Sequence, residues 1–413
     1  MAVASSPETH EKFLKATSML GPQIEQLLKR NRPDCLVVDV FFLWATDVAA
    51  KYGIPSLIFH GTSYIALCTS LCMYRYEPHK RVSSEYEPFI IPNLPDEIEF
   101  TASRVPDFLK EDAESEFINV IYKESKEAES RSYGVLVNSF YELEPAYADH
   151  YTNVLGIKAW HIGPLFLYDK GTTPKEKAER GILEASIDDH QCSTWLDSKK
   201  PNSVIYVCFG SLTSFSDKQL MEIAMGLEDS GQQFIWVVQK EIKRQGFKEE
   251  WLPEGLEERM EGRGLIIRGW APQVVILEHE AVGAFVTHCG WNSTLEGVCA
   301  GLPMVAWPVS AEQFYNEKLV TQILGIGIGV GVRTWSRDGG DFVRREVIEQ
   351  AVRRVMEGEE AVEMRSKSRG LAEMARRAIE EGGSSYLDLD ALFEELSLAR
   401  IARDSSQGEF VTR

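Results

Sequence analysis

Short apolar, β-branched runs alternate with longer helical patterns along most of the chain. The runs that predict strands are CLVVDVF (35–41), PSLIFH (55–60), YGVLVNSF (133–140), SVIYVCFGS (203–211), FIWVVQ (234–239), GLIIRGW (264–270), AFVTHC (284–289) and PMVAWPV (303–309). Between two of these runs, Leu220, Ile223, Ala224 and Leu227 repeat at helical spacing, and Gly231 follows as a stop signal. Strands that are apolar on both faces and alternate with helices predict parallel sheets covered by helices on both sides.

This alternation occurs in two halves of the chain, on either side of YDKGTTPKEKAERGILEASIDD, which is rich in charge, Gly and Thr. We therefore expect an α/β fold with two domains that face a cleft, where ligands bind at the carboxyl ends of the strands. The expected boundaries are 1–167 for the first domain, 168–190 for the linker, 191–385 for the second domain, and 386–413 for a C-terminal helix with a disordered tail. One long charged helix is predicted from Glu346 through RGLAEMARRAIEEGG (369–383).

Composition limits the classes of function. The chain has 413 residues, of which 44% are hydrophobic and 26% are charged, as in ordinary globular proteins. Its formal net charge of -19 argues against nucleic-acid binding, but a few N–H groups at a helix start can still bind phosphate. Seven scattered Cys without a CxxC pair favour a reduced compartment. With neither a signal-peptide pattern nor an apolar run long enough to span a bilayer, we expect a cytoplasmic monomer without a transmembrane segment.

The stretch THCGWNSTLEGV (287–298) brings several chemically active side chains together. A metal site is not expected, because His288 and Cys289 are neighbours on a strand and point to opposite faces. The same geometry argues against a Cys–His nucleophile pair. At the carboxyl end of a strand, His288 could contact a pyrophosphate, although a single His is more often structural.

A helix is predicted to begin at Asn292 or Ser293. Ser293 and Glu296 have the spacing of a capping box, which would explain both side chains without a ligand. The free N–H groups of a helix start beside Gly290 also form an anion site. Capping and ligand binding both remain open for this segment.

Two neighbouring positions have the chemistry of a nucleotide-sugar site. Trp270 ends a strand before a Pro-containing turn, where an aromatic ring could stack on a base or simply lie at a rim. Glu312 and Gln313 follow another strand and could hydrogen-bond a polyhydroxylated ligand or form a solvated loop.

Residues 270–313, WAPQVVILEHEAVGAFVTHCGWNSTLEGVCAGLPMVAWPVSAEQ, resemble the signature box of plant secondary-product UDP-glycosyltransferases. Four other segments are also similar to that family: CLVVDVFFLWATDVAAKYGIP, VLVNSFYELEPAY, WHIGPL and VIYVCFGS. The resemblance implies a GT-B fold, with two Rossmann-like domains that face a cleft. The first domain would bind the acceptor and the second the UDP-sugar.

By position, the resemblance implies a set of donor-binding residues. These are Ser211, Trp270, Ala271, Gln273, His288, Gly290, Trp291, Asn292, Ser293, Glu296, Glu312 and Gln313. Trp270 would stack on uracil with Gln273 near the nucleoside, and Glu296 would hold the ribose hydroxyls.

The rest of this set would contact the diphosphate and the sugar. His288, Asn292 and Ser293 would bind the pyrophosphate, with Ser211 nearby. The sugar would face Trp291, Glu312 and Gln313. Gln at the last position of the box fits UDP-glucose better than UDP-galactose, and no metal or cofactor is implied.

The implied reaction is displacement at the anomeric carbon with inversion, in which a neutral His oriented by an Asp takes the proton of the acceptor hydroxyl. Asp39 matches that Asp and is the expected catalytic residue, although a strand-end Asp can also simply cap the next helix. The catalytic His of the family precedes this Asp, and we expect that the chain lacks that segment. It would then be an incomplete gene model or fragment, an inactive short isoform, or a chain with another base. His60 is the candidate for another base, and we expect it to face the sugar or the acceptor.

Two functions remain in competition. The first is glucose transfer from UDP-glucose to a hydroxyl of a plant specialised metabolite, such as a flavonoid, a triterpenoid or steroid, or a phenol. The alternative is a catalytically impaired UDP-sugar-binding protein that lacks the general base. In both cases the expected partners are a UDP-sugar and a small hydroxylated acceptor, without nucleic acid.

Overall fold

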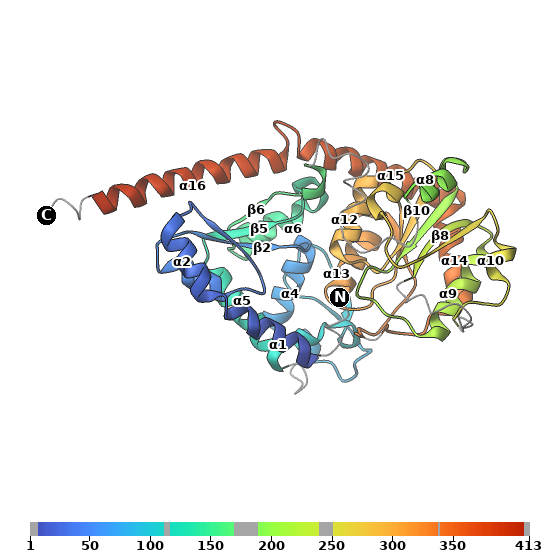
Figure 1. Cartoon of the computed structure of the whole chain (residues 1–413). Helices are drawn as coiled ribbons and strands as arrows, with labels where there is room; N and C mark the ends of the chain where they lie inside the picture. Colours follow the sequence, from blue (N-terminus) through green and yellow to red (C-terminus); the bar gives the residue numbers. More distant parts are fainter. Residues whose placement is uncertain (1–6, 111–115, 169–188, 239–250, 338, 409–413) are drawn as a thin grey trace.

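The computed structural model describes residues 7–110, 116–168, 189–238, 251–337 and 339–408, and its strands form two parallel sheets (Figure 1). The first sheet has the order β1-β2-β5-β6, with β1 (Leu36–Asp39), β2 (Ser56–His60), β5 (Gly134–Val137) and β6 (Ala159–His161). The second has the order β12-β11-β10-β7-β8-β9, with β7 (Val204–Cys208), β8 (Gln233–Val238), β9 (Gly264–Arg268), β10 (Val282–Thr287), β11 (Met304–Ala306) and β12 (Gly327–Gly329). The predicted α/β architecture with parallel sheets is confirmed.

Every apolar run that predicted a strand contains one in the structure. The sequence pattern did not predict β6 and β12, which are three residues long and lie at sheet edges. A small antiparallel pair, β3 (Pro88–Ile90) and β4 (Glu99–Thr101), was also not predicted. Segments this short carry too few residues for a periodicity to be recognised.

Helices cover both sheets. In the first half they are α1 (Pro7–Ser18), α2 (Gly21–Asn31), α3 (Trp44–Ala50), α4 (Tyr64–Tyr76), α5 (Glu116–Arg131) and α6 (Pro145–Asp149). In the second half they are α8 (Asp189–Asp197), α9 (Asp217–Ser230), α10 (Leu256–Arg259), α11 (Gln273–Leu277), α12 (Trp291–Ala300), α13 (Gln313–Lys318), α14 (Arg345–Met356), α15 (Gly358–Ala378) and α16 (Ser384–Gly408). Figure 1 shows strands β8 and β10 between α12 and α15 on one side and α9 and α14 on the other.

Helix α9 has the caps that its sequence requires. Ser216 is the N-cap, and its hydroxyl accepts a hydrogen bond from the N–H of Gln219 at 3.2 Å. Gly231 ends the helix in the left-handed conformation, with φ of 71°. The predicted helix and its stop are therefore confirmed.

The prediction of one long charged helix after Glu346 is wrong. The structure has two helices, α14 and α15, separated at Glu357, whose backbone is extended. Gly358 follows with φ of 80°, a conformation that interrupts a helix and favours glycine. Charged residues continue across the break, so the composition of this segment conceals it.

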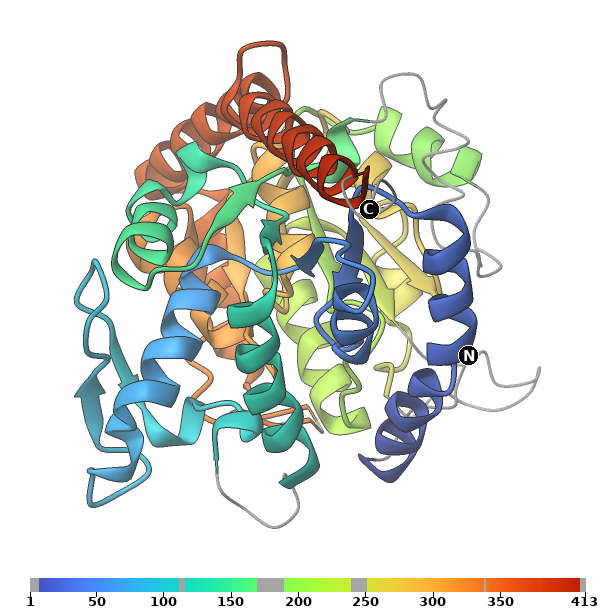
Figure 2. The same ribbon diagram turned by 90° about the vertical axis from the view of Figure 1, so that its left-hand side faces the viewer.

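The last helix returns to the first half of the molecule. Figure 1 and Figure 2 show α16 running from the second half across the first sheet. Its Leu392 and Leu396 are buried against apolar residues of that sheet, including Leu57 and Trp160. Most of the expected linker, residues 169–188, and the end of the expected tail, 409–413, lie outside the described residues.

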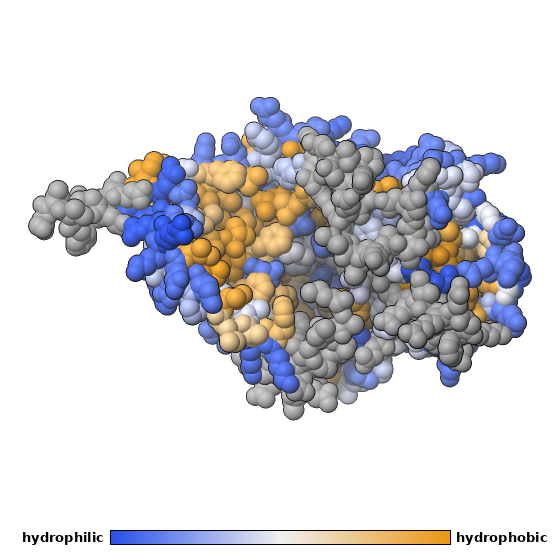
Figure 3. Space-filling model, in the orientation of Figure 1, coloured by the Kyte–Doolittle hydropathy of each residue, from blue (hydrophilic) through white to orange (hydrophobic). Residues whose placement is uncertain are grey.

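Apolar side chains are exposed on the first half (Figure 3). Strand β1 lies at the edge of the described sheet, and Val37 on it and Phe41 just after it are 53% and 51% exposed. Among the helices that the structure describes, none is long and apolar enough to cross a bilayer.

Candidate active site

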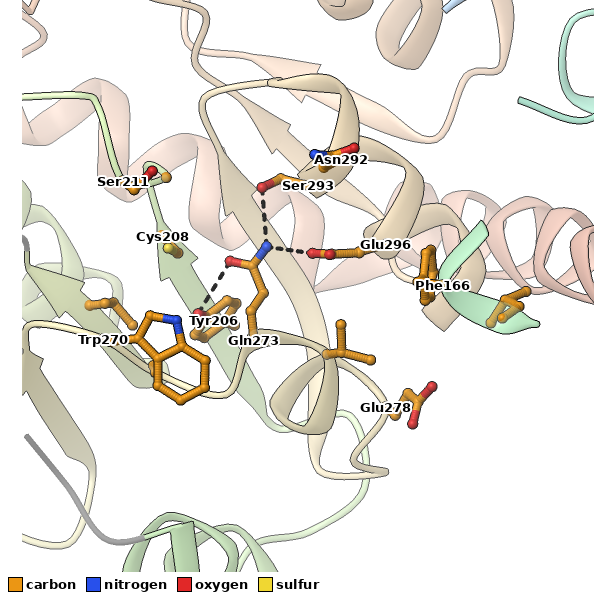
Figure 4. A pocket seen from close by; sticks show the side chains of 15 residues that line it. Phe166, Tyr206, Cys208, Ser211, Trp270, Gln273, Glu278, Asn292, Ser293 and Glu296 are labelled. Carbon is orange, nitrogen blue, oxygen red and sulfur yellow. Dashed lines mark hydrogen bonds between the residues drawn. The ribbon is translucent and has the colours of Figure 1, made fainter. Parts of the chain in front are cut away.

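A cavity of about 330 Å³ opens at the carboxyl ends of the strands of the second sheet. Parallel sheets usually bind ligands at this edge. The predicted donor residues that line it are Ser211, Trp270, Ala271, Gln273, Asn292, Ser293 and Glu296. Figure 4 shows the labelled side chains of this set converging from the loops after β7 and β9, from the start of α11 and from the first turns of α12. We call this space the donor cavity.

The side chain of Gln273 connects three elements at the floor of the donor cavity (Figure 4). Its Nε2 donates to Oε2 of Glu296 at 2.6 Å and to Oγ of Ser293 at 3.1 Å. Its Oε1 accepts from the hydroxyl of Tyr206 at 3.4 Å. Ser293 and Glu296 do not form the capping box that was one alternative for this segment: the N-cap of α12 is Gly290, and Gln273, which lies 20 and 23 positions earlier, binds both side chains.

Helix α12 begins one or two residues earlier than predicted. Its N-cap is Gly290, and no side chain forms a capping hydrogen bond. The N–H groups of a first helical turn have no partner within the helix, and the helix dipole makes this end favourable for anions. Asn292, in that turn, is exposed and lines the donor cavity.

The imidazole of His288 packs between two glycines beside this helix start. A Cβ atom at Gly210 would lie 2.7 Å from His288 Cε1, and one at Gly290 would lie 2.5 Å from His288 Nε2. Burial lowers the pKa of His288 to about 4, so the ring is neutral at physiological pH. Its buried Nδ1 has no hydrogen-bond partner among the described residues.

Cys289 is directed into the protein. The residue has a left-handed backbone with φ of 63°, and its side chain is fully buried. Burial raises the pKa of its thiol well above the usual range, which does not suit a nucleophile. Within the described ranges, no group of three His, Cys, Asp or Glu side chains could hold a metal ion.

Three residues expected at the sugar lie outside the lining of the donor cavity. The indole N–H of Trp291 donates to the carbonyl of Asn138 in the first half, at 2.7 Å. Gln313 is buried, and its Oε1 accepts from the N–H groups of Val309 and Ser310, both at 2.8 Å, so the alternative of a solvated loop is wrong for this side chain. Glu312 is partly buried, and burial raises its pKa.

Glu312 lines a second cavity, of about 190 Å³, between the two halves. The surface that faces this cavity is mostly apolar, although polar side chains also contribute, and the other lining residues all belong to the first half: Val40, Phe41, His60, Thr62, Ala66, Leu67, Ser70, Phe108, Tyr122, Ser125 and Lys126. We call it the acceptor-side cavity. It faces both the ends of β1 and β2 and the loop that carries Glu312.

His60 lines the acceptor-side cavity, but its Nε2 is 2.9 Å from Oε1 of Glu129. Lys126 lies 2.8 Å from the same carboxylate oxygen, and His60 and Glu129 are both buried. Burial alone would raise the pKa of Glu129, yet Lys126 and His60 outweigh it and lower this pKa to about 2. The carboxylate partner of His60 is thus Glu129.

Asp39 lies at the carboxyl end of β1 and is exposed. Its Oδ1 accepts from the N–H of Phe41 at 3.0 Å, so the carboxylate stabilises the turn after the strand. Asp39 lines neither cavity, while Val40 and Phe41, the next residues, line the acceptor-side cavity.

Residues 18–360 match the family described as "UDP-glucoronosyl and UDP-glucosyl transferase". The chain belongs to the UDP-glycosyltransferase family. It is 60% identical over 394 residues to the UDP-glucose flavonoid 3-O-glucosyltransferase 7 of Fragaria ananassa, covering 94% of this chain and 79% of that relative. The resemblance inferred from the signature box is therefore confirmed.

Solved structures of plant glycosyltransferases share the fold. A Glycyrrhiza uralensis structure, complexed with glycyrrhetinic acid 3-O-monoglucuronide, matches with a TM-score of 0.89 and 39% identity over 100% of this chain and 83% of the other. A Medicago truncatula structure, complexed with UDP-glucose, matches with a TM-score of 0.78 and 30% identity over 95% of this chain and 81% of the other. The expected GT-B fold is confirmed.

Several residues of this glycosyltransferase line the donor cavity without having been predicted. They are Phe166, Leu167, Tyr206, Cys208, Gly210, Val237, Val274 and Glu278. Phe166 and Leu167 come from the short turn Leu165–Leu167, which follows strand β6 of the first sheet. A sequence pattern cannot show that this turn reaches the second domain, although its position directly after WHIGPL could have drawn attention to it.

Proposed function

We propose that this glycosyltransferase binds UDP-glucose in the donor cavity and transfers glucose to a hydroxyl of a small specialised metabolite. The main support is the donor cavity itself, where Trp270, the Gln273–Glu296 pair and the start of α12 line one space. An aromatic face suits a uracil ring, a carboxylate suits ribose hydroxyls, and N–H groups at a helix start suit a diphosphate. The size of the cavity is within the usual range for small-molecule sites.

Glucose is the proposed sugar. Gln313 ends the signature box, and its Oε1 is held by two backbone N–H groups, which fixes the side chain in one orientation. The Fragaria ananassa relative is named a glucosyltransferase, and the Medicago truncatula structure contains UDP-glucose. Both support the same donor for this chain.

The proposed reaction is a displacement with inversion. The acceptor oxygen forms a bond to the anomeric carbon, while the bond from that carbon to the diphosphate oxygen breaks and UDP leaves with the electron pair. The N–H groups at the start of α12 stabilise the charge on the diphosphate. His288 is neutral, so it assists through a hydrogen bond and not through a positive charge.

The acceptor is proposed to lie in the acceptor-side cavity, whose apolar walls suit an aromatic or terpenoid skeleton. A general base must take the proton of the acceptor hydroxyl, and Asp39 is the residue proposed to orient that base. Of the histidines whose side chains the structure describes, none is hydrogen-bonded to Asp39, and His60 is bound to Glu129. The pairing of His60 with Glu129 is the observation behind a second candidate function, in which the chain binds the UDP-sugar without efficient turnover.

Calorimetry and a transfer assay separate the two functions. We expect the chain to bind UDP and UDP-glucose, and to bind UDP-glucose more tightly than UDP-galactose. The replacement Glu296→Ala should weaken UDP binding by at least about tenfold, because it removes the charge-assisted hydrogen bond proposed between this carboxylate and the ribose hydroxyls. UDP release in the presence of flavonols, triterpenoids or simple phenols supports transfer, and binding without release supports the second function. No binding of UDP would refute both.

A further inference from the structure

Asn316, on α13, links the two domains through a single buried amide group. Its Nδ2 donates to the carbonyl of Cys289 in the second domain at 2.9 Å. Its Oδ1 accepts from the hydroxyl of Ser63 in the first domain at 2.6 Å. Asn316 and Ser63 are both fully buried.

The chemistry of the partners fixes the orientation of this amide. A backbone carbonyl can only accept, so the atom that faces Cys289 must be the Nδ2 group. The oxygen then faces Ser63, whose hydroxyl donates to it and accepts from the N–H of Ala66 at 3.2 Å. Removal of the Ser63 hydroxyl therefore leaves Oδ1 of Asn316 without its donor. Removal of the Asn316 amide leaves the Ser63 hydroxyl without its acceptor.

On the donor side, the amide holds the peptide unit that follows Cys289. This residue has the left-handed backbone between His288 and Gly290, and its N–H is held by Thr287 Oγ1 at 3.3 Å. The direction of its carbonyl sets the direction in which the chain enters α12. The hydrogen bond from Asn316 thus helps to place the helix start that faces the donor cavity.

On the acceptor side, the same amide holds the start of α4. Ser63 is the N-cap of this helix, and Ala66, Leu67 and Ser70 on its first two turns line the acceptor-side cavity. A displacement of Ser63 would move that wall. Asn316 therefore contacts both the frame of the donor cavity and a wall of the acceptor-side cavity.

A second hydrogen bond crosses between the domains nearby. The indole of Trp291, the first residue of α12, donates to the carbonyl of Asn138, which follows β5. Two buried contacts on the same helix start restrict both the distance and the orientation of the domains at the cleft.

We propose that Asn316 is a positioning residue that couples UDP binding in the second domain to the placement of α4 in the first. This inference rests on the proposed donor function, because it requires UDP to bind beside α12. Its consequence is that a change in the first domain, at a residue that lines neither cavity, weakens UDP binding. Ser63 is such a residue.

The test is the affinity for UDP, measured by calorimetry on the full chain, with the replacement Ser63→Ala. Coupling between sites is usually worth at least about fivefold in affinity, and we expect a loss of that size. The matched control is Ser216→Ala, which removes the equivalent N-cap of α9, also at 3.2 Å, inside the second domain itself. An unchanged affinity in Ser63→Ala, or an equal loss in both variants, would overturn the proposal.

A second pair of variants keeps the test valid if Ser63→Ala is poorly folded. Gly is a tolerated N-cap, so Ser63→Gly removes the hydroxyl with little cost to α4. Asn316→Ala should weaken UDP binding at least as much, and the double variant should lose less than the sum of the single losses in free energy, because both break one contact. Additive losses would contradict the coupling.

If the unmodified chain does not bind UDP, the proposed donor function fails. If the chain binds UDP and the affinity is insensitive to both residues, only the coupling is refuted.

Discussion

Nε2 of Gln273 lies 2.6 Å from Oε2 of Glu296 and joins the start of α11 to the second turn of α12. The replacement Gln273→Glu would place a second carboxylate at this position, and two like charges so close repel each other. We expect the affinity for UDP to fall by about 10- to 100-fold, measured by calorimetry at neutral pH.

A surface pair of the same chemistry provides the control for this variant. Nε2 of Gln232 donates to Oε1 of Glu357 at 2.5 Å on the exposed side of the second domain. Gln232→Glu also places two carboxylates side by side, with more screening by water, away from the donor cavity, and it should leave UDP affinity unchanged. A similar loss in both variants would show that Gln273 acts through general stability and not through the cavity.

Gly210 allows the His288 ring to lie against the backbone, since a Cβ atom there would be 2.7 Å from the imidazole. Gly210→Ala should therefore displace the ring and weaken UDP binding. Gly231→Ala is the matched control, because Gly231 has nearly the same φ, 71° against 72°. A Cβ atom at Gly231 would meet no other part of the described chain within 4 Å.

Both glycine variants share the strain of a left-handed alanine, about 1–2 kcal/mol. Only Gly210→Ala adds a steric clash, which typically costs about 1–3 kcal/mol more in a packed site. Urea unfolding should show this difference, and calorimetry should show a loss of UDP affinity in Gly210→Ala alone. Equal behaviour of the two variants would mean that the ring adapts freely.

The buried imidazole of His288 should make stability depend on pH. Its pKa is about 4 in the folded chain, against an ordinary value of 6.5. Between these values the unfolded chain takes up a proton that the folded chain does not, so the free energy of unfolding falls as pH falls. The loss is about 2 kcal/mol by pH 5 and about 3 kcal/mol by pH 4.

The replacement His288→Asn should remove this part of the pH dependence. Urea unfolding of both proteins at pH 7.5 and pH 5 measures it. If the two proteins lose the same free energy over this range, His288 is not held neutral by burial.

Lys126 stabilises the charged carboxylate of Glu129, which burial alone would disfavour. Lys126→Met leaves Glu129 buried with only His60 as a partner, and breaking a buried pair in this way usually costs about 3–5 kcal/mol. The loss should be largest at neutral pH and should shrink as pH falls below 4.5, because protonation removes the charge of Glu129.

An exposed pair gives the comparison for Lys126. Lys367 lies 2.8 Å from Glu363, and both side chains are largely exposed. Lys367→Met should change the free energy of unfolding by no more than about 1 kcal/mol. A small effect of Lys126→Met, similar to this control, would contradict the account of the buried cluster.

The sequence predicted those parts of the fold and site that depend on local pattern. The strands of both sheets except β6 and β12, the helix from Asp217 to Ser230, and the cavity around Trp270 and Glu296 follow from apolar runs or from the signature box. The errors arise where distant residues decide. Gln273 binds the side chains that looked like a capping box, and Glu129 on helix α5 binds His60 on strand β2.

Contacts between the domains also could not be predicted from the sequence. Neither Ser63 nor Asn316 stands out in the chain, and their partnership joins positions 253 residues apart. The break between α14 and α15 depends on one extended residue and one glycine within a charged segment, where both helices share the same composition.

Helix α16 is a second connection between the domains. The first connection is the stretch of chain that leads from the turn after β6 to α8. The second is α16 itself, which follows α15 in the second domain and packs on the first sheet. Two connections between the domains oppose their separation more than one connection would. A single proteolytic cut within 169–188 would therefore leave the two domains attached to each other through their own C-terminal helix.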